Sequence, residues 1–282
     1  MGSEMEHHSR ARTALFAGAA LAGFAANSLL CRAALRGGTI DAWSFTCVRL
    51  ASGALVLGLL ARTWREGSWA SALALVAYAG LFSFAYLSIP AGVGALVLFG
   101  AVQATMIGWS VRAGRRPRKF ECCGLALALG GLAYLTLPGA GASDARGLAL
   151  MASAGIAWGV YSLRGRSTER PLLATAGNFA RGLVLVLPFA GFARVELSTR
   201  GLVLACASGA LASGLGYSLW YAALPGMSAT RAALVQLSVP LLTALAAVLL
   251  LGERPNERLF YSGLAILGGI ALAVLWPQRR SD

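Results

Sequence analysis

The chain has 282 residues, of which 57% are hydrophobic and only 12% are charged, and its mean hydropathy is +0.69. Soluble domains usually carry about 25% charged residues, so this composition excludes a disordered chain and argues against a water-soluble protein. The net charge of +13 does not indicate nucleic-acid binding, because the basic residues lie in short gaps between apolar runs. We therefore expect a polytopic protein of the lipid bilayer, with no nucleic-acid partner.

Ten apolar runs follow one another along the chain, each close to the length of about 20 residues that a membrane-spanning helix needs. The runs cover residues 13–35, 41–61, 69–89, 92–112, 120–137, 146–164, 172–193, 200–222, 228–250 and 258–276. Pro or Gly residues separate most of the runs, as they do between helices. The sequence therefore predicts an all-α fold with ten transmembrane helices.

The two ends of the chain are short and polar. We expect residues 1–12 to form a disordered cytoplasmic leader and residues 278–282 to form a cytoplasmic tail. Arg and Lys are more frequent in the connections on the side of the two termini than in the alternate connections. By the positive-inside rule, we expect a multi-pass protein of the cell (inner) membrane with both termini in the cytoplasm.

The chain also repeats itself, at an offset of 132 to 138 residues. The matching positions are Arg49 and Arg181, Tyr86 and Tyr221, Pro90 and Pro225, and Gly130–Gly131 and Gly268–Gly269. The repeats divide the chain into residues 13–140 and 141–277, with five predicted spans in each. An odd number of spans forces the second copy to insert in the opposite orientation, so we expect two inverted five-helix repeats with a substrate site between them.

The connections that end corresponding spans of the two halves differ in charge. Residues 112–119 contain five basic residues and no acidic residue, whereas residues 252–258 contain two basic and two acidic residues. Corresponding connections with opposite charge character are expected on opposite sides of the membrane, which supports the inversion independently.

Aromatic side chains at a four-residue spacing share one face of the third predicted span and recur at corresponding positions of the eighth. With aromatic and amide side chains of other spans they form a candidate substrate cavity: Asn27, Tyr78, Phe82, Tyr86, Phe99, Gln103, Trp158, Tyr161, Tyr217, Trp220, Tyr221 and Gln236. Aromatic walls suit aromatic or apolar substrates, and amides can hold the charged groups of an amino acid. Packing, interfacial anchoring and hydrogen bonds between helices are the alternatives for these residues.

Arg49 and Arg181 are the deepest charges in the predicted spans, each about a third of the way in from opposite faces. Two roles are open for this pair. Each side chain can be structural and reach back to its own membrane interface, or it can bind a carboxylate of the substrate.

Several chemistries lack the residues that they need. No Asp, Glu or His lies well inside a predicted span, which argues against a buried proton relay. The sequence has no GxxxxGK[ST] loop, no HExxH motif and no intramembrane Ser–His pair, so we expect neither ATP-driven pumping nor proteolysis. The five cysteines lack metal-binding spacing, and we expect no metal and no cofactor.

Residues 217–243, followed by Gly252-Glu253-Arg254 and a Gly-rich helix, resemble the EamA module of the drug/metabolite transporter superfamily. The region of Arg49 and the Ala157-Trp158-Gly159 segment also fit this module. Within the superfamily the chain is similar to YddG-like exporters of aromatic amino acids. The resemblance implies ten helices built from two modules, with Trp158 and the aromatic residues of the third and fourth spans around a central cavity. The first half departs from the pattern at Gln103, where the second half has Pro240.

The leading hypothesis is a secondary transporter or facilitator, not an enzyme, that exports small organic metabolites by alternating access. We expect aromatic or large apolar amino acids as substrates, a cavity lined by the first, third, fourth, sixth, eighth and ninth spans, and no need for an oligomer. Purines, sugars or cationic drugs are alternative substrates. A non-transporting membrane scaffold or an intramembrane enzyme is the alternative of another class.

Overall fold

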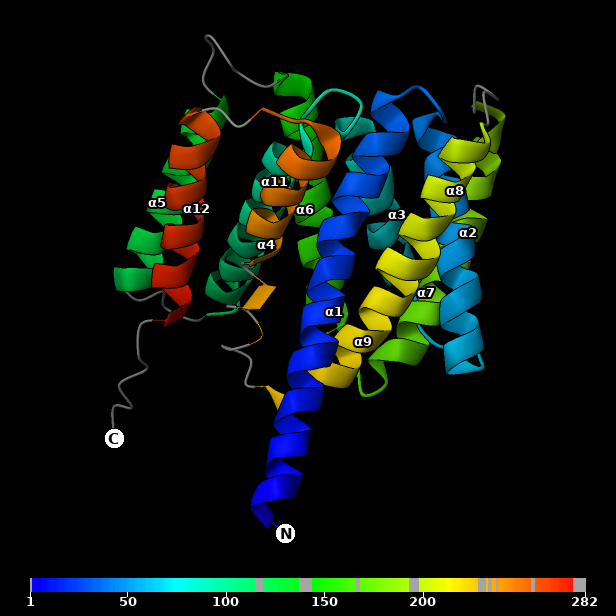
Figure 1. Cartoon of the computed structure of the whole chain (residues 1–282), viewed down its shortest axis with the longest axis horizontal. Coiled ribbons are helices and arrows are strands. Elements are labelled where there is room, and N and C mark those ends of the chain that lie inside the picture. Colours follow the sequence, from blue (N-terminus) through cyan, green and yellow to red (C-terminus); the bar gives the residue numbers. More distant parts are fainter. Residues whose placement is uncertain are drawn as a thin grey trace.

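The computed structural model describes residues 2–114, 119–136, 144–165, 168–192, 198–227, 232, 235–236, 238–254 and 257–275, and the regular elements in these ranges are all helical (Figure 1). The fold is that of an all-α polytopic membrane protein, as the sequence predicted. The first part of the predicted span 228–250 lies mostly outside the described residues, as do residues 115–118 and the tail 278–282.

The first half of the chain contains five helices. They are α1 (Gly2–Arg36), α2 (Ala42–Ala61), α3 (Trp69–Ala85), α4 (Ala91–Arg112) and α5 (Lys119–Thr136). Helix α1 includes residues 2–12, which the sequence analysis predicted to be disordered, and in this respect the structure and the prediction differ. The segment contains no Pro, and its Glu, Met and Arg residues have good helix propensity, so helix α1 extends back to Gly2.

The second half contains the corresponding helices, two of them irregular. The elements are α6 (Ala145–Gly165), α7 (Pro171–Val186) with the 3₁₀ segment η1 (Leu187–Phe192), α8 (Thr199–Ala207), the π-helical segment η2 (Ser208–Leu215), α9 (Gly216–Ala223), the 3₁₀ turn η3 (Leu224–Gly226), α11 (Ser238–Leu251) and α12 (Glu257–Leu275). Elements α8, η2 and α9 form one continuous helix that corresponds to the predicted span 200–222.

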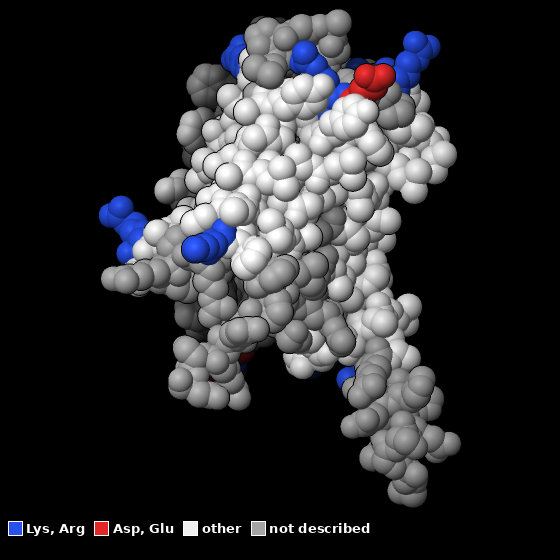
Figure 2. All heavy atoms as spheres, turned by 90° about the vertical axis from the view of Figure 1, so that its left-hand side faces the viewer, with Lys and Arg blue, Asp and Glu red and all other residues white. Residues whose placement is uncertain are grey.

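Five of the described helical segments are long and apolar enough to cross a membrane: 11–36, 42–61, 91–112, 171–189 and 199–226. Shorter apolar helices occur at Trp69–Ala85, Cys122–Gly131 and Ser238–Leu251. On the face shown in Figure 2, Lys and Arg side chains lie at the upper end, next to an acidic side chain, and at about mid-height on the left, with a broad uncharged surface between the two groups. This surface is suited to contact with lipid.

Local chemistry fixes where several helices begin. The Asp41 carboxylate accepts hydrogen bonds from Trp43 N and Ser44 N at 2.9 and 3.0 Å, and thereby caps α2. The Ser68 hydroxyl caps α3 by accepting a hydrogen bond from Ser71 N. Pro90 and Pro171 stand at the starts of α4 and α7, where a missing N–H costs least.

The helices pack in pairs that match the two predicted repeats. Helix α3 packs against α6, and the counterparts of α3 in the second half, η2 and α9, pack against α1. In the same way α4 contacts α6, and its counterpart α11 contacts α1. Three helices pack against their own counterparts: α2 against α7, α4 against α11, and α5 against α12. Figure 1 shows α5 and α12 side by side at one edge of the bundle and α2, α7 and α8 at the other.

The paired glycines that first suggested the repeat meet at the α5–α12 contact. A Cβ at Gly131 would lie 2.7 Å from the Ala265 Cβ, and a Cβ at Gly269 would overlap the Gly124 carbonyl oxygen. Corresponding residues therefore permit the close approach of two corresponding helices. The α5–α12 contact therefore uses glycines at corresponding positions of the two predicted repeats.

Candidate functional site

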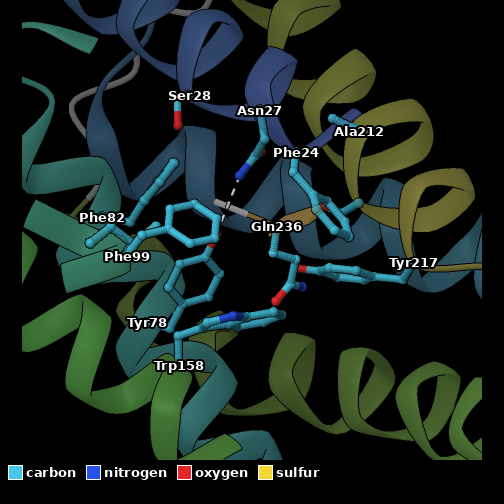
Figure 3. A pocket seen from close by; sticks show the side chains of 12 residues that line it. Phe24, Asn27, Ser28, Tyr78, Phe82, Phe99, Trp158, Ala212, Tyr217 and Gln236 are labelled. Carbon is cyan, nitrogen blue, oxygen red and sulfur yellow. Dashed lines mark hydrogen bonds between the residues drawn. The ribbon is translucent and has the colours of Figure 1, made fainter. Parts of the chain in front are cut away.

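A cavity lies between the two halves, near the middle of the helices (Figure 3). Its walls come from α1, α3, α4, α6, η2, α9 and Gln236, which are parts of the six spans that the sequence analysis assigned to a central cavity. The lining residues are Phe24, Asn27, Ser28, Tyr78, Phe82, Leu98, Phe99, Trp158, Ala212, Ser213, Tyr217 and Gln236. The volume of about 40 Å³ holds a few water molecules.

Trp158 is at the centre of the aromatic wall. The centroid of its ring lies 4.8 Å from that of Tyr78 on α3 and 5.4 Å from that of Tyr217 on α9, with the Tyr217 ring stacked at 20°. Phe24 on α1 continues the wall, 5.6 Å from Tyr217. Figure 3 shows Gln236 reaching into this aromatic enclosure above Trp158. The cavity therefore offers flat apolar surfaces with a few polar groups among them, the composition that is usual for a small-molecule site.

Asn27 connects α1 to both halves of the cavity wall. Its Nδ2 donates to the Tyr78 hydroxyl at 3.3 Å, and its Oδ1 accepts a hydrogen bond from the Ser208 hydroxyl at 2.6 Å. Ser208 begins the π-helical segment η2, and Ser213 lies within the same segment. Such segments arise where a helix is locally widened, and they are frequent at functional sites.

Arg49 on α2 lies directly behind the cavity wall and is only 1% exposed. Its Nη2 donates to the Tyr78 hydroxyl at 3.1 Å and its Nε donates to Ser213 Oγ at 3.3 Å. The guanidinium carbon also lies 5.1 Å from the Tyr78 ring centroid and 5.2 Å from that of Phe82. Arg49 therefore does not reach back to a membrane interface.

Arg181, the counterpart of Arg49 on α7, binds a connection instead of the cavity wall. It donates to the carbonyl oxygens of Arg65 at 2.8 Å and of Glu66, and its guanidinium carbon lies 5.8 Å from the Trp69 ring centroid. Asn178, one turn earlier, accepts a hydrogen bond from Ser68 N at 2.9 Å. Together these contacts attach the connection between α2 and α3 to α7.

Seven of the twelve candidate cavity residues line the cavity, and five do not. Tyr161 and Tyr221 instead join a neighbouring polar cluster through Thr175, at 3.3 and 2.9 Å. Trp220 packs against Phe24 on the α1 side, and the Tyr86 hydroxyl donates to Ala91 O at 3.3 Å. Gln103 is half-buried farther along α4.

The residues that the sequence analysis missed are Phe24, Ser28, Leu98, Ala212 and Ser213. Two signals in the sequence could have found some of them. Phe24 and Ser28 flank Asn27 at helical spacing on α1. Ser213 follows Tyr78 by 135 residues, the offset that relates Tyr86 to Tyr221, so Tyr78 and Ser213 occupy corresponding positions in the two repeats.

An acidic side chain connects the two halves at one end of the bundle. Glu253, which follows α11, accepts hydrogen bonds from Ala91 N through both carboxylate oxygens at 2.9 Å, and thus caps α4 of the first half. The Arg32 Nε on α1 lies 3.6 Å from the same carboxylate, and Arg32 also donates to Tyr86 O at 2.7 Å. These contacts join α1, α3, α4 and α11 above the cavity.

Asp144 is at the same end of the bundle and begins α6. Its carboxylate accepts hydrogen bonds from the Ser88 hydroxyl at 2.7 Å and from Gly147 N at 2.8 Å. These bonds, the Ser88 bond most of all, lower the pKa of Asp144 below its ordinary value. The carboxylate is thereby kept ionised where it caps the helix.

Comparisons with known proteins identify relatives over nearly the whole chain. A sequence model of the EamA-like transporter family matches residues 145–275, the second repeat. An uncharacterised protein of Pseudomonas aeruginosa is 51% identical over 277 residues, which cover 95% of this chain and 96% of the relative. An uncharacterised transporter of Archaeoglobus fulgidus is 28% identical over 232 residues, which cover 76% of this chain and 78% of the transporter. A protein of known crystal structure, 20% identical, has the same fold with a TM-score of 0.67 over 96% of this chain and 99% of the other.

Proposed function

The chain belongs to the EamA-like transporter family of the drug/metabolite transporter superfamily and is a membrane transporter of small molecules; from this premise we propose that it exports amino acids with aromatic or large apolar side chains. The observation that carries the proposal is the cavity between the two repeats, where Trp158, Tyr78 and Tyr217 form an aromatic enclosure. Aromatic rings bind an aromatic side chain by stacking, at about 0.5–1.5 kcal/mol for each ring pair. In this proposal the Asn27 and Gln236 amides hold the polar end of the substrate.

We propose that the transport mechanism is alternating access. The contacts of Glu253 with α4 and α1 close one end of the bundle, and the small volume of the cavity requires the two halves to move apart before a substrate enters. In the proposed orientation the closed end faces outward and both termini lie in the cytoplasm, at the inner membrane. Since no Asp, Glu or His lies well inside a span, we expect movement down the gradient of the substrate or by exchange.

Counterflow in proteoliposomes tests this function. Vesicles that contain the purified protein and unlabelled phenylalanine or tryptophan should accumulate the labelled amino acid from outside, with or without a pH gradient. Trp158→Ala should reduce the rate by roughly tenfold, because the substrate loses stacking on the ring at the centre of the aromatic wall. The matched control is Trp109→Ala on α4, because Trp109 is 59% exposed and does not line the cavity. No accumulation of any amino acid by the unmodified protein would reject the proposal.

A further inference from the structure

Arg49 carries a buried positive charge with no acidic partner among the described residues. Its two hydrogen-bond acceptors are neutral hydroxyl groups, and the described carboxylates lie at the ends of the helices, as Asp41, Glu66, Asp144 and Glu253 do. A buried charge is costly unless it is compensated by an opposite charge or by several hydrogen bonds. One guanidinium nitrogen, Nη1, is buried with no hydrogen-bond partner in the described part of the chain. The charge is therefore only partly compensated.

The hydrogen bonds of Arg49 set the direction of two hydroxyl groups in the cavity wall. The Tyr78 oxygen accepts one bond from Arg49 Nη2 and one from Asn27 Nδ2, and the Ser208 hydroxyl holds the Asn27 amide in that orientation. Guanidinium and amide N–H groups only donate, so the Tyr78 O–H cannot donate to either of them. The Tyr78 O–H therefore donates to an acceptor other than these two groups. The Tyr78 side chain lines the cavity.

Ser213 is in the same situation in the opposite repeat. Its Oγ accepts a hydrogen bond from Arg49 Nε, and its side chain also lines the cavity. Tyr78 and Ser213 are corresponding residues of the two repeats, so a single guanidinium polarises one hydroxyl group in each half. A hydroxyl that accepts a bond from a cation becomes a stronger donor, because hydrogen bonds in a chain polarise one another.

We propose that Tyr78 and Ser213 bind the carboxylate of the substrate, and that Arg49 is the positioning residue that orients both hydroxyls and supplies the compensating positive charge. The inference rests on the proposed function, because it names the group by which the transporter recognises an amino acid. A carboxylate has only acceptor atoms, so it matches two converging donors, and its charge is opposite to that of the guanidinium. Since the two hydroxyls belong to different repeats, the bound carboxylate bridges the surfaces that move apart during alternating access.

A matched series of three ligands tests this assignment on the purified full-length protein. The probes are L-phenylalanine, 3-phenylpropionate, which keeps the carboxylate and lacks the ammonium group, and phenethylamine, which lacks the carboxylate. Thermal-shift titrations should show that both carboxylates bind and that phenethylamine binds at least about tenfold more weakly. Tyr78→Phe and Ser213→Ala should each weaken the binding of both carboxylates by about tenfold and leave phenethylamine unaffected.

The controls are the same substitutions outside the cavity. Tyr86→Phe removes a buried hydroxyl from the end of α3, and Ser218→Ala removes a hydroxyl that donates to Gly214 O within the helix. Both should change the melting temperature without changing the preference among the three ligands. If Tyr78→Phe does not fold, Ser213→Ala decides the same question.

The outcomes separate this inference from the proposed function. The carboxylate assignment is overturned if phenethylamine binds as tightly as phenylalanine, if neither Tyr78→Phe nor Ser213→Ala alters the preference, or if the unmodified protein binds neither carboxylate. Counterflow of phenylalanine that persists in those cases leaves the transport function standing. Binding of 3-phenylpropionate with the expected variant effects, but without amino-acid counterflow, supports the carboxylate site and rejects amino-acid transport.

Discussion

Arg49 and Arg181 occupy corresponding positions in two repeats of one chain, yet their surroundings differ. Arg49 is buried behind the cavity and donates to two side-chain hydroxyls, whereas Arg181 is half-exposed and donates to backbone carbonyls of the connection between α2 and α3. The carbonyls are fixed acceptors that compensate the charge of Arg181 within the fold. The hydroxyls leave Arg49 incompletely compensated. Under the proposed roles, the two corresponding residues serve ligand recognition in one half and attachment of a connection in the other.

The largest difference between the two arginines should appear in ligand binding. Arg49→Gln removes the charge and releases both hydroxyls, so we expect the affinity for L-phenylalanine to fall by roughly 30-fold or more, in line with the loss of a partner from a buried charged contact. Arg181→Gln should change the same affinity by less than about threefold, because Arg181 does not line the cavity. Titration of both variants with phenylalanine measures the difference. Equal losses of affinity would contradict the assignment of separate roles.

The structural role of the Arg181 region can be tested at Gly177. A Cβ at this position would overlap the Glu66 carbonyl oxygen to which Arg181 donates. Gly177→Ala should therefore displace the connection and destabilise the fold by about 1–3 kcal/mol, seen as a lower melting temperature. Gly80→Ala on α3 is the matched control, because a Cβ there meets no atom within 4 Å, and we expect it to be neutral or slightly stabilising. Equal melting temperatures for the two variants would show that Gly177 does not constrain the connection.

A second asymmetry between the halves concerns Glu253, whose counterpart connection 112–119 has no acidic residue. Glu253→Gln should weaken the cap on α4 and the contact with Arg32, and favour opening of that end of the bundle by about tenfold, the usual effect of a lost charged hydrogen bond. Labelling of Ser28→Cys in the cavity by a membrane-impermeant thiol reagent, in a background without other cysteines, measures the opening. Glu257→Gln, at the exposed start of α12, is the control. An unchanged labelling rate would mean that Glu253 does not hold this end closed.

The smallest expected effect concerns Asp144, which caps α6 as Asp41 caps α2. Because its hydrogen bonds lower the pKa of Asp144 in the folded protein, the carboxylate contributes stability that is present above the ordinary value of 3.8 and is lost as the pH falls through the lowered pKa. The melting temperature should therefore decrease slightly below about pH 4, and this part of the decrease should be absent in Asp144→Asn. Identical pH profiles for the two proteins would show that the cap does not contribute.

The sequence predicted the fold because two strong signals agree along its length. Hydropathy located the helices, and the matched Arg, Tyr, Pro and Gly residues predicted two repeats, whose odd number of spans predicts inverted packing. The sequence also identified Trp158, Tyr78, Tyr217 and Gln236, which line the cavity. It did not separate them from Tyr86 and Tyr221, because residues on one helical face can lie at different depths and only the packing of neighbouring helices decides which of them meet the cavity.

The sequence by itself determined that this protein is a bundle of membrane helices. It did so through the length of the apolar runs, and it also gave the orientation expected from the basic residues and the correspondence of Arg49 with Arg181. The tertiary structure alone decided what each arginine binds. Segment η2 is π-helical, which places Ser208 against Asn27 and Ser213 against Arg49, and Glu253 reaches the start of α4 from the opposite repeat. The physical reason is that spacing along a chain fixes the face of a helix, whereas hydrogen bonds between helices depend on their separation and register, which are set by contacts among residues distant in sequence.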